Sequence, residues 1–491
     1  MSGTRAAPER AATRPRLVVG VLAFCGVVVA VMQTLVVPLL PHVPELTGST
    51  PTAASWLITI TLLSGAVCTP VLGRLGDMYG KRRVLLASLG VLVAGSVLCA
   101  ASSHIGVLIA GRACQGAALA VVPLGISILR DELDPARMLP AVALMSSTLG
   151  IGAAVGLPAA ALVVEYSDWH TMFWVSAGLG LLDIVLVLCF VPESPLRSPG
   201  RFDVLGAAGL SAGLVALLLA VTQGGDWGWA SGRTLGLLAG CAVIWPLWGW
   251  YELRVRAPMM DLRVSARPAV LLTNVAALLI GFAFYANSLV TAQLVQEPTS
   301  TGYGLGASLV VSSLCLLPGG LAMVALSPVS ARISAAFGPK VTLAVAAGCM
   351  AVGYGVRYFT SHALWSIIVG ATVVAAGTAI AYSALPALVM RAVPACATAS
   401  ANGLNTLMRS IGQACCSAVV AAVLSGLTVR VDGRTVPTFH AYLLLFLVAA
   451  GAALLALAVT LCLPGHAAPA RPRFLGRAAD ADPRPRAGRR P

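Results

Sequence analysis

The residues of this chain that could do chemistry are isolated within long apolar runs. Arg112 lies deep in one run, and Asn402, Asn405 and Arg409 lie in another at spacings of three and four, along one face of a helix. Charged and amide groups in such runs are costly unless they face water, a cavity or a partner. We therefore expect them to bind a solute or move a proton. A structural ion pair or a snorkelling side chain is the alternative for Arg112.

No catalytic or metal-binding pattern accompanies these residues. The sequence contains no Walker-type phosphate loop, no GxSxG nucleophile elbow and no HExxH zinc motif. Most of the twelve cysteines lie in apolar runs, where cysteine acts as a small hydrophobe. We expect neither an enzyme nor a bound metal or cofactor.

The elements that position these residues are membrane helices. The chain has 491 residues, of which 58% are hydrophobic and only 10% charged, whereas about a quarter of the residues of a soluble protein are charged. Apolar runs of roughly 20 residues recur along its length, which is the span of a bilayer core. They predict an all-α integral membrane fold of about fourteen helices, at 17–40, 53–72, 84–101, 105–129, 138–164, 171–191, 203–222, 234–253, 269–294, 307–328, 341–359, 363–389, 397–427 and 440–463.

The positive charge is distributed unequally between the two membrane faces. About 26 of the 32 Lys and Arg fall on one face or in the termini, which predicts that both termini are cytoplasmic. The net charge of +14 therefore orients a multi-pass protein in the cell membrane and does not indicate nucleic-acid binding. With only two lysines, the composition points to a GC-rich bacterial genome. The predicted outer face holds Arg233, Arg357, Arg430 and Arg434.

An internal repeat divides the chain. The pairs Ser103-His104 and Ser361-His362 each precede an apolar helix, and Gly80 and Gly338 precede them at the same offset of 258 residues. A six-helix unit needs only about 200 residues, so the surplus predicts an inserted helix pair. We expect an N-terminal tail (1–16), a six-helix bundle (17–200), an inserted hairpin (201–258), a second six-helix bundle (259–463) and a disordered cytoplasmic tail (464–491).

The charged segment Gly73–Arg83 reads G-R-L-G-D-x-x-G-K-R and lies between two apolar runs. It resembles the loop between the second and third helices of major facilitator superfamily transporters. The resemblance implies a gating loop that latches the cytoplasmic side, with Asp77 as its charge-pairing element. An Asp in this position can pair with a nearby cation or cap a helix end. The loop residues are Gly73, Arg74, Gly76, Asp77, Gly80, Lys81 and Arg82.

Two further segments resemble the same superfamily. Arg112, Gln115 and Gly116 match the R-x-x-Q-G element of its fourth helix, where the arginine is associated with proton coupling. Gly152, Gly156 and Pro158 resemble the antiporter motif of its fifth helix, but Leu157 follows Gly156, and Ala159-Ala160 replace a glycine pair. Small residues four apart also permit close helix packing, so packing is the alternative for this motif.

The first helix departs from the pattern of the fourteen-helix drug/proton antiporters, which carry an Asp where this chain has Gln33. Because glutamine cannot titrate, a proton must bind elsewhere or not at all. The remaining acidic candidates in the first half are Glu165 and Asp183, which together with Arg112 form the predicted proton-coupling set. Asp183 pairing within the bundle is the alternative.

The predicted substrate cavity combines polar residues of both halves. Interhelical hydrogen bonding is an equally good interpretation of each of them. The set is Gln33, Gln115, Asn274, Asn287, Asn402, Asn405 and Arg409.

The resemblance covers residues 17–463 and implies a secondary transporter of the fourteen-helix drug/proton antiporter type. Such a protein exports hydrophobic small molecules, such as drugs or antibiotics, by alternating access coupled to protons. The partners are then a small-molecule substrate, protons and the lipid bilayer, and we expect a monomer. Gln33 and the incomplete antiporter motif favour an alternative, a facilitator or importer without proton antiport. A non-transporting membrane sensor is a third hypothesis.

Overall fold

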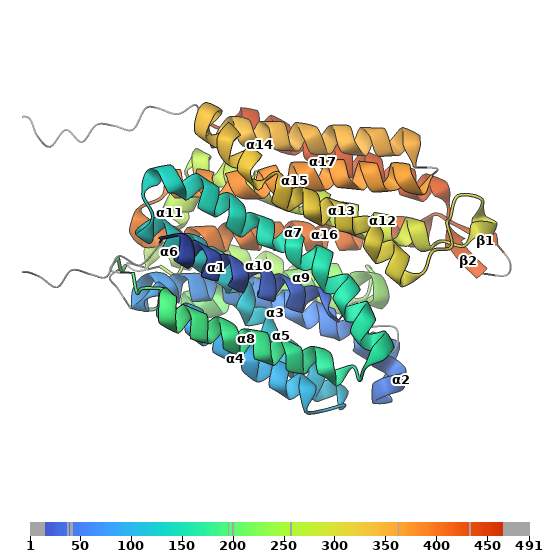
Figure 1. Ribbon diagram of the computed structural model, residues 1–491, viewed down its shortest axis with the longest axis horizontal. Coiled ribbons are helices and arrows are strands. Elements are labelled where there is room, and N and C mark those ends of the chain that lie inside the picture. The colour runs from blue at the N-terminus through green and yellow to red at the C-terminus, as the bar shows by residue number, and fades with distance from the viewer. Residues whose placement is uncertain are drawn as a thin grey trace, which may run out of the picture.

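The computed structural model describes residues 15–36, 39, 43–194, 196–198, 201–255, 258–361, 363–431 and 434–464. Long helices run side by side along one common direction (Figure 1). They are α1 (Pro15–Thr34), α3 (Pro51–Tyr79), α4 (Lys81–Ala100), α5 (Ile105–Gly116), α6 (Val121–Glu132), α7 (Pro135–Tyr166), α8 (His170–Phe190), α9 (Val204–Trp227), α10 (Gly232–Arg254), α12 (Pro268–Gln296), α13 (Leu309–Ala325), α14 (Ser327–Thr360), α15 (Leu364–Ala392), α16 (Thr398–Gly426) and α17 (Phe439–Leu461).

Twelve helices of the described chain are long and apolar enough to cross a bilayer. The predicted all-α membrane fold is therefore confirmed. Helices α7 and α13 occupy the places of the predicted fifth and tenth spans but are not among those twelve. The count of fourteen spans stays a prediction.

The predicted turn 73–83 is wrong in extent. Helix α3 continues to Tyr79 and α4 begins at Lys81, so Gly80 alone separates them, with φ = 117°. Gly338, at the repeat offset of 258, also has a positive φ (84°) and bends α14. Charged residues near a helix end are compatible with the helix, whereas a positive φ is adopted at little cost only by glycine. The two glycines therefore mark the corresponding bend in each half.

Two other details differ from the prediction. The fourth span is interrupted by a short 3₁₀ turn, η1 (Ala117–Ala120), between α5 and α6. A two-stranded antiparallel hairpin, β1 (Thr428–Val431) with β2 (Arg434–Pro437), connects α16 to α17. The remaining short elements are α2 (Val43–Thr47), α11 (Leu262–Ser265), η2 (Thr299–Thr301) and η3 (Ala395–Ala397).

The apolar core has separate parts. One cluster lies mainly among α1 to α8 and includes Leu22 and Leu89, while a second lies among α12 to α17 and includes Ile280 and Phe446. A third cluster joins α9 and α10 to α3 and α16. We propose on this basis two bundles with an inserted α9–α10 hairpin.

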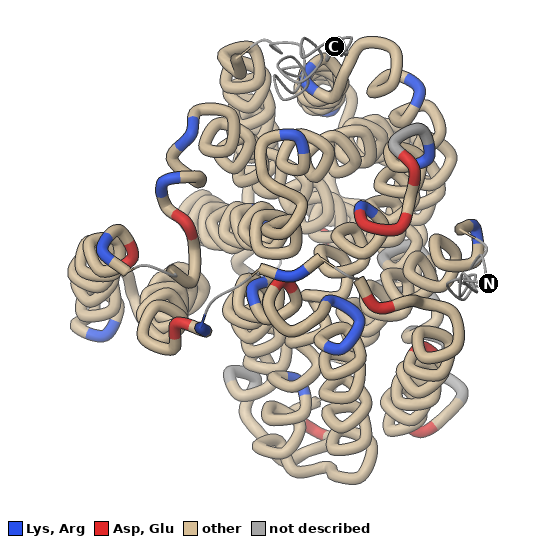
Figure 2. The backbone as a smooth tube through the Cα atoms, turned by 90° about the vertical axis from the view of Figure 1, so that its left-hand side faces the viewer, with Lys and Arg blue, Asp and Glu red and all other residues tan. Residues whose placement is uncertain are grey.

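Charged residues gather at the ends of the helices. Figure 2 looks onto the end where α3 stops and α16 begins, and Lys, Arg, Asp and Glu lie there on turns and helix ends. Arg357 is an exception that corrects the sequence analysis, which assigned it to the outer face. Its side chain is fully buried, because it turns inward to Asn287 and Thr291 of α12.

Candidate functional site

Asp77 lies at the centre of a contact between the two halves. It is fully buried, and its carboxylate accepts hydrogen bonds from the backbone N–H groups of Ala399 (3.2 Å) and Ser400 (2.8 Å) and from the Ser400 hydroxyl (2.7 Å). These N–H groups belong to the first turn of α16, which has no partners for them inside the helix. A carboxylate there is also favoured by the helix dipole. Within the described chain, the hydrogen-bond partners of the Asp77 carboxylate thus belong to the end of a helix, which is the capping role that the sequence also allows.

Arg130 makes a second contact across the same interface. Its guanidinium extends from the last turn of α6. It donates to the hydroxyl of Thr398 (2.5 Å), the first residue of α16, and to the backbone carbonyl of Val393 (3.1 Å), which follows α15. We call the group formed by Asp77, Arg130, Thr398 and Ser400 the latch. Its members join α3 and α6 to the start of α16 through hydrogen bonds.

Lys81 does not take part in the latch. Its ammonium lies 2.5 Å from Asp131 of α6, both side chains are buried, and Ser194 donates to the same carboxylate oxygen. A buried ion pair with additional hydrogen bonds orients its two helices, although it adds little stability by itself. Lys81 therefore fixes α4 to α6 within the first half.

Glycines bring α3 close to its neighbours at this end. A Cβ atom at Gly73 would lie 2.8 Å from the carbonyl oxygen of Ala399, and one at Gly76 would lie 2.5 Å from the Leu124 side chain. The glycine positions of the predicted gating segment thus allow helix contact. Arg74 donates to Ser198 and Arg82 to the carbonyl of Leu188, which holds the last turn of α8 and the chain after it against the same end.

Arg112 is buried in α5 and links three helices. It donates to the backbone carbonyls of Leu57 (3.2 Å) and Met32 (3.1 Å) and to the Gln115 side chain (2.7 Å). Met32 belongs to the last turn of α1, where carbonyl groups lack helix partners and a cation is favoured. Among the described residues no carboxylate forms an ion pair with Arg112. Its charge is thus satisfied by carbonyl dipoles.

The predicted cavity residues of the first half have different environments. Gln115 is occupied on both sides, by Arg112 and by the hydroxyl of Ser96 on α4 (2.8 Å). Gln33 lies next to Met32 on α1, and its buried side-chain nitrogen has no hydrogen-bond partner among the described residues. Gln115 therefore serves packing, whereas Gln33 keeps a donor for another group.

The glycine motif of α7 packs against α1. A Cβ atom at Gly152 would lie 2.1 Å from the Cβ of Ala30, and one at Gly156 would lie 2.0 Å from the hydroxyl of Thr34. The Thr34 hydroxyl also approaches the carbonyl of Gly152 (3.3 Å). These two positions require glycine for close helix contact. The side chain of Pro158 lies outside the described residues.

We expect Gly152→Val to abolish transport and destabilise the protein, because the added atoms would overlap α1 and cost about 1–3 kcal/mol. The matched control is Gly178→Val on α8, where a Cβ would meet no atom within 4 Å. Thermal unfolding in detergent and a transport assay measure the two effects. Equal unfolding midpoints for the two variants would contradict the packing role.

Asp183 is the acidic residue of α8 and is fully buried. Within the described chain it is the only Asp or Glu lying more than one turn from the end of a long helix. Among the described residues the Cys25 thiol of α1 is the polar group next to its carboxylate, and neither carboxylate oxygen has another hydrogen-bond partner there. An ionised carboxylate without a partner is costly in such surroundings. The side chain of Glu165 lies outside the described residues.

The amides of the second half form two groups. Asn405 donates to Asn274 of α12 (3.1 Å), while both polar atoms of Asn402 lack a partner among the described residues. Asn287 accepts from the Arg357 guanidinium (2.6 Å) and donates to the Ala371 carbonyl (3.1 Å). Asn287 thus belongs to the core of the second bundle.

Arg409 is buried on α16. Its guanidinium carbon lies 4.5 Å from the ring centre of Tyr382, which is a cation–π contact, and it donates to the hydroxyl of Thr406 (2.9 Å). Its Nε has no partner among the described residues. The residue keeps one donor available.

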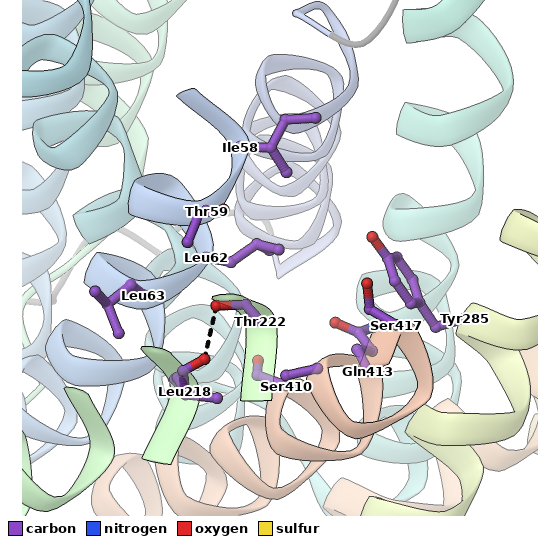
Figure 3. A pocket seen from close by; sticks show the side chains of 11 residues that line it. Ile58, Thr59, Leu62, Leu63, Leu218, Thr222, Tyr285, Ser410, Gln413 and Ser417 are labelled. Carbon is purple, nitrogen blue, oxygen red and sulfur yellow. Dashed lines mark hydrogen bonds between the residues drawn. The ribbon is translucent and has the colours of Figure 1, made fainter. Parts of the chain in front are cut away.

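A pocket of about 110 Å³ lies between α3, α9, α12 and α16 (Figure 3). None of the predicted cavity residues lines it. The sequence analysis missed a neighbouring stripe on α16, in which Ser410, Gln413 and Ser417 recur at helical spacing. The lining residues are Ile58, Thr59, Leu62, Leu63, Leu218, Thr222, Tyr285, Ser410, Gln413, Ala414 and Ser417.

Several known proteins are similar to this chain. The multidrug resistance protein Stp of Mycobacterium tuberculosis is 28% identical over 376 residues, which cover 75% of this chain and 68% of that protein. The tetracenomycin C resistance and export protein of Streptomyces glaucescens is 27% identical over 292 residues, 59% of this chain and 53% of that protein. The chain thus spans about half the length of the second relative.

The fold and the sequence lead to the same family. The crystal structure of the human organic anion transporter MFSD10 (TETRAN) matches 91% of this chain and 99% of its own, with a TM-score of 0.66 and 18% identity, which shows the fold. The Major Facilitator Superfamily sequence profile matches residues 22–416. The chain belongs to the Major Facilitator Superfamily of membrane transporters.

Proposed function

We propose that this protein exports hydrophobic small molecules from a bacterial cell by alternating access coupled to inward proton movement. Two similar proteins carry resistance or export in their names. The pocket between the two halves is lined by apolar and hydroxyl-bearing side chains, which suits such a solute. Both termini would lie in the cytoplasm, and the transporter would act as a monomer.

The latch is the main structural observation that supports this proposal. Alternating access requires an interface that closes firmly and opens reversibly. Asp77 and Arg130 reach across to the start of α16 through hydrogen bonds of 2.5 to 3.2 Å, while the α3 glycines keep the helices close. Such hydrogen bonds can break and reform reversibly. The latch would close the cytoplasmic end of the transporter.

Proton coupling would use Asp183 and Arg112. Asp183 is a buried carboxyl beside α1, and Arg112 holds the carbonyl of Met32 on the same helix. Protonation of Asp183 removes a buried charge next to α1. The position of α1 would then depend on protonation, which is what coupling needs.

A pH-gradient assay tests the proposal. The chain would be reconstituted into liposomes and the efflux of substrates from a susceptibility panel followed with and without a protonophore. Export that follows the proton gradient supports antiport. Export that ignores the gradient supports the facilitator, for which Gln33 is the motivating residue. Absence of any flux would favour the sensor.

We expect Asp183→Asn to lose gradient-driven export by about tenfold or more while retaining downhill flux, because the amide cannot carry the proton. The control is Asp168→Asn in the loop before α8. There, hydrogen bonds from His170 hold the pKa of Asp168 below its ordinary value, and the side chain is exposed. Gradient-driven export at the wild-type rate in Asp183→Asn would remove this residue from the mechanism.

A further inference from the structure

The inserted hairpin lies against the seam between the two bundles. Leu210, Leu214 and Leu218 of α9 pack in one apolar cluster with residues of α3, such as Leu63, and of α16, such as Leu407. Helices α3 and α16 belong to opposite halves of the proposed transporter. The hairpin therefore contacts both moving parts and not only one of them.

The hairpin is itself a well-packed unit. Trp248 of α10 donates from its ring N–H to the carbonyl of Gly206 on α9 (2.8 Å), and Tyr251 donates to Asp203 (2.9 Å). A Cβ at Gly209 would lie 2.7 Å from the Trp248 ring, so the two helices meet closely. The position of α9 at the seam is thereby fixed by α10.

Helix α9 also forms one wall of the pocket (Figure 3). Leu218 and Thr222 point toward the space that residues of α3, α12 and α16 enclose. The Thr222 hydroxyl donates to the carbonyl of Leu218 (2.7 Å), which leaves the lone pairs of its oxygen to accept a bond from a solute. Ala208 and Ala212 of the same helix are exposed. One side of α9 thus faces the pocket while another faces outward.

The side chains that line the pocket indicate the class of solute. Apolar side chains of α3 and α9 form one side, and hydroxyl and amide groups, among them Tyr285, Gln413 and Ser417, form the other. Among the described residues that line the pocket, none is Asp, Glu, Lys, Arg or His. Without a carboxylate, the pocket offers no counter-ion to a cation. It suits an uncharged, largely apolar molecule that carries carbonyl, ether or hydroxyl groups.

We propose that α9 of the inserted hairpin supplies part of the binding site for an uncharged amphiphile, through Leu218 and Thr222. The inference rests on the proposed function, which it deepens by naming the substrate class. The volume of about 110 Å³ is below the roughly 300–1,000 Å³ of pockets that hold drug-sized ligands. Binding therefore requires the walls to separate, and α9 is the wall that touches both bundles.

The test measures binding and not transport. The purified full chain in lipid nanodiscs is titrated with Nile red, an uncharged dye whose fluorescence rises in apolar sites, against empty nanodiscs. Thr222→Trp and Leu218→Trp should each weaken saturable binding by about tenfold or more, because the indole fills the pocket. Thr222→Val should leave Nile red binding within about twofold of the wild type, because this dye has no N–H or O–H group to donate to the Thr222 oxygen. Gel filtration verifies that each variant is folded.

The matched control is Leu235→Trp, an exposed position in the first turn of α10, which should stay within about twofold of the wild type. Unchanged Nile red binding in both pocket variants, no saturable binding to the wild type, or tighter binding of the cation ethidium would each overturn the proposal. If the pocket variants weaken binding while liposomes show no proton-driven export, the proposed function alone fails.

Discussion

Replacing Asp77 with Asn is expected to reduce export by about tenfold or more, with unchanged membrane insertion, because hydrogen bonds to a charged group contribute about 1.5–3 kcal/mol. The carboxylate accepts two backbone N–H groups and one hydroxyl at the start of α16. An amide presents one oxygen and no charge, so closure of the latch loses most of this stabilisation. Transport in liposomes and the amount of purified protein measure the two effects.

The same variant should open the latch end. Tyr79 and Phe337 are exposed, lie at the repeat offset of 258 and flank the two positive-φ glycines, so spin labels there report the separation of the bundles. The labelling background replaces the exposed Cys189 and Cys462 with Ser. Asp77→Asn should lengthen and broaden the distance distribution.

The control for this experiment is another capping aspartate. Asp261→Asn removes the negative charge from the N-cap of the short helix α11, where the carboxylate accepts from the backbone N–H groups of Arg263 and Val264. This change should leave both export and the label distances at wild-type values. A distance distribution in Asp77→Asn that matches the wild type would show that the latch does not depend on this charge.

The second large effect is expected from substitutions of Arg112. We expect Arg112→Lys to be as inactive as Arg112→Ala, each retaining about 1% of wild-type export or less, since each buried carbonyl left unpaired costs about 1–3 kcal/mol. The guanidinium satisfies Leu57, Met32 and Gln115 at once, from two of its nitrogens. A lysine ammonium has three donors but not this planar, branched geometry.

The lysine variant separates two roles of Arg112. If only its charge matters, Lys restores gradient-driven export; if its position between α1, α3 and α5 matters, Lys fails in downhill flux as well. Our structure favours the second outcome. Arg254→Lys on α10, where Arg254 stacks on Trp250, is the control and should transport normally. Rescue by Lys would contradict the positioning role.

Composition and periodicity predict much of the fold. Apolar runs of bilayer length locate the helices, and the offset between Gly80 and Gly338 corresponds to two bends with positive φ. The Gly73–Arg83 segment and Arg112 with Gln115 indicate the superfamily, and the sequence profile confirms it. Each of these features is a short stretch of sequence or a comparison of two such stretches, so a single sequence is enough to identify them.

The sequence did not predict which helix each buried polar side chain contacts. Arg357 looked like an outer-face residue, but its partners Asn287 and Thr291 come from another helix. Likewise, Asp77 looked like a member of a charged loop, whereas its partners lie more than 300 residues further along the chain. Such pairings depend on how helices pack, which periodicity does not determine.

The pocket shows the same limit. Its polar wall on α16 is displaced around the helix from the amides that the sequence singled out, and α9 enters it from a hairpin that the repeat pattern treats as an insertion. The sequence analysis selected other polar residues of the apolar runs, and it did not consider Ser410, Gln413 and Ser417, which recur at helical spacing.

The paired bends also show where the two halves differ. Gly80 has its counterpart in Gly338, whereas the residue at the same offset from Asp77 is Ala335. The two halves thus share the glycine bend, whereas only the first half has the carboxylate. The latch is therefore asymmetric between otherwise similar halves, and we expect that removal of the single Asp77 charge weakens it without any compensating carboxylate at position 335.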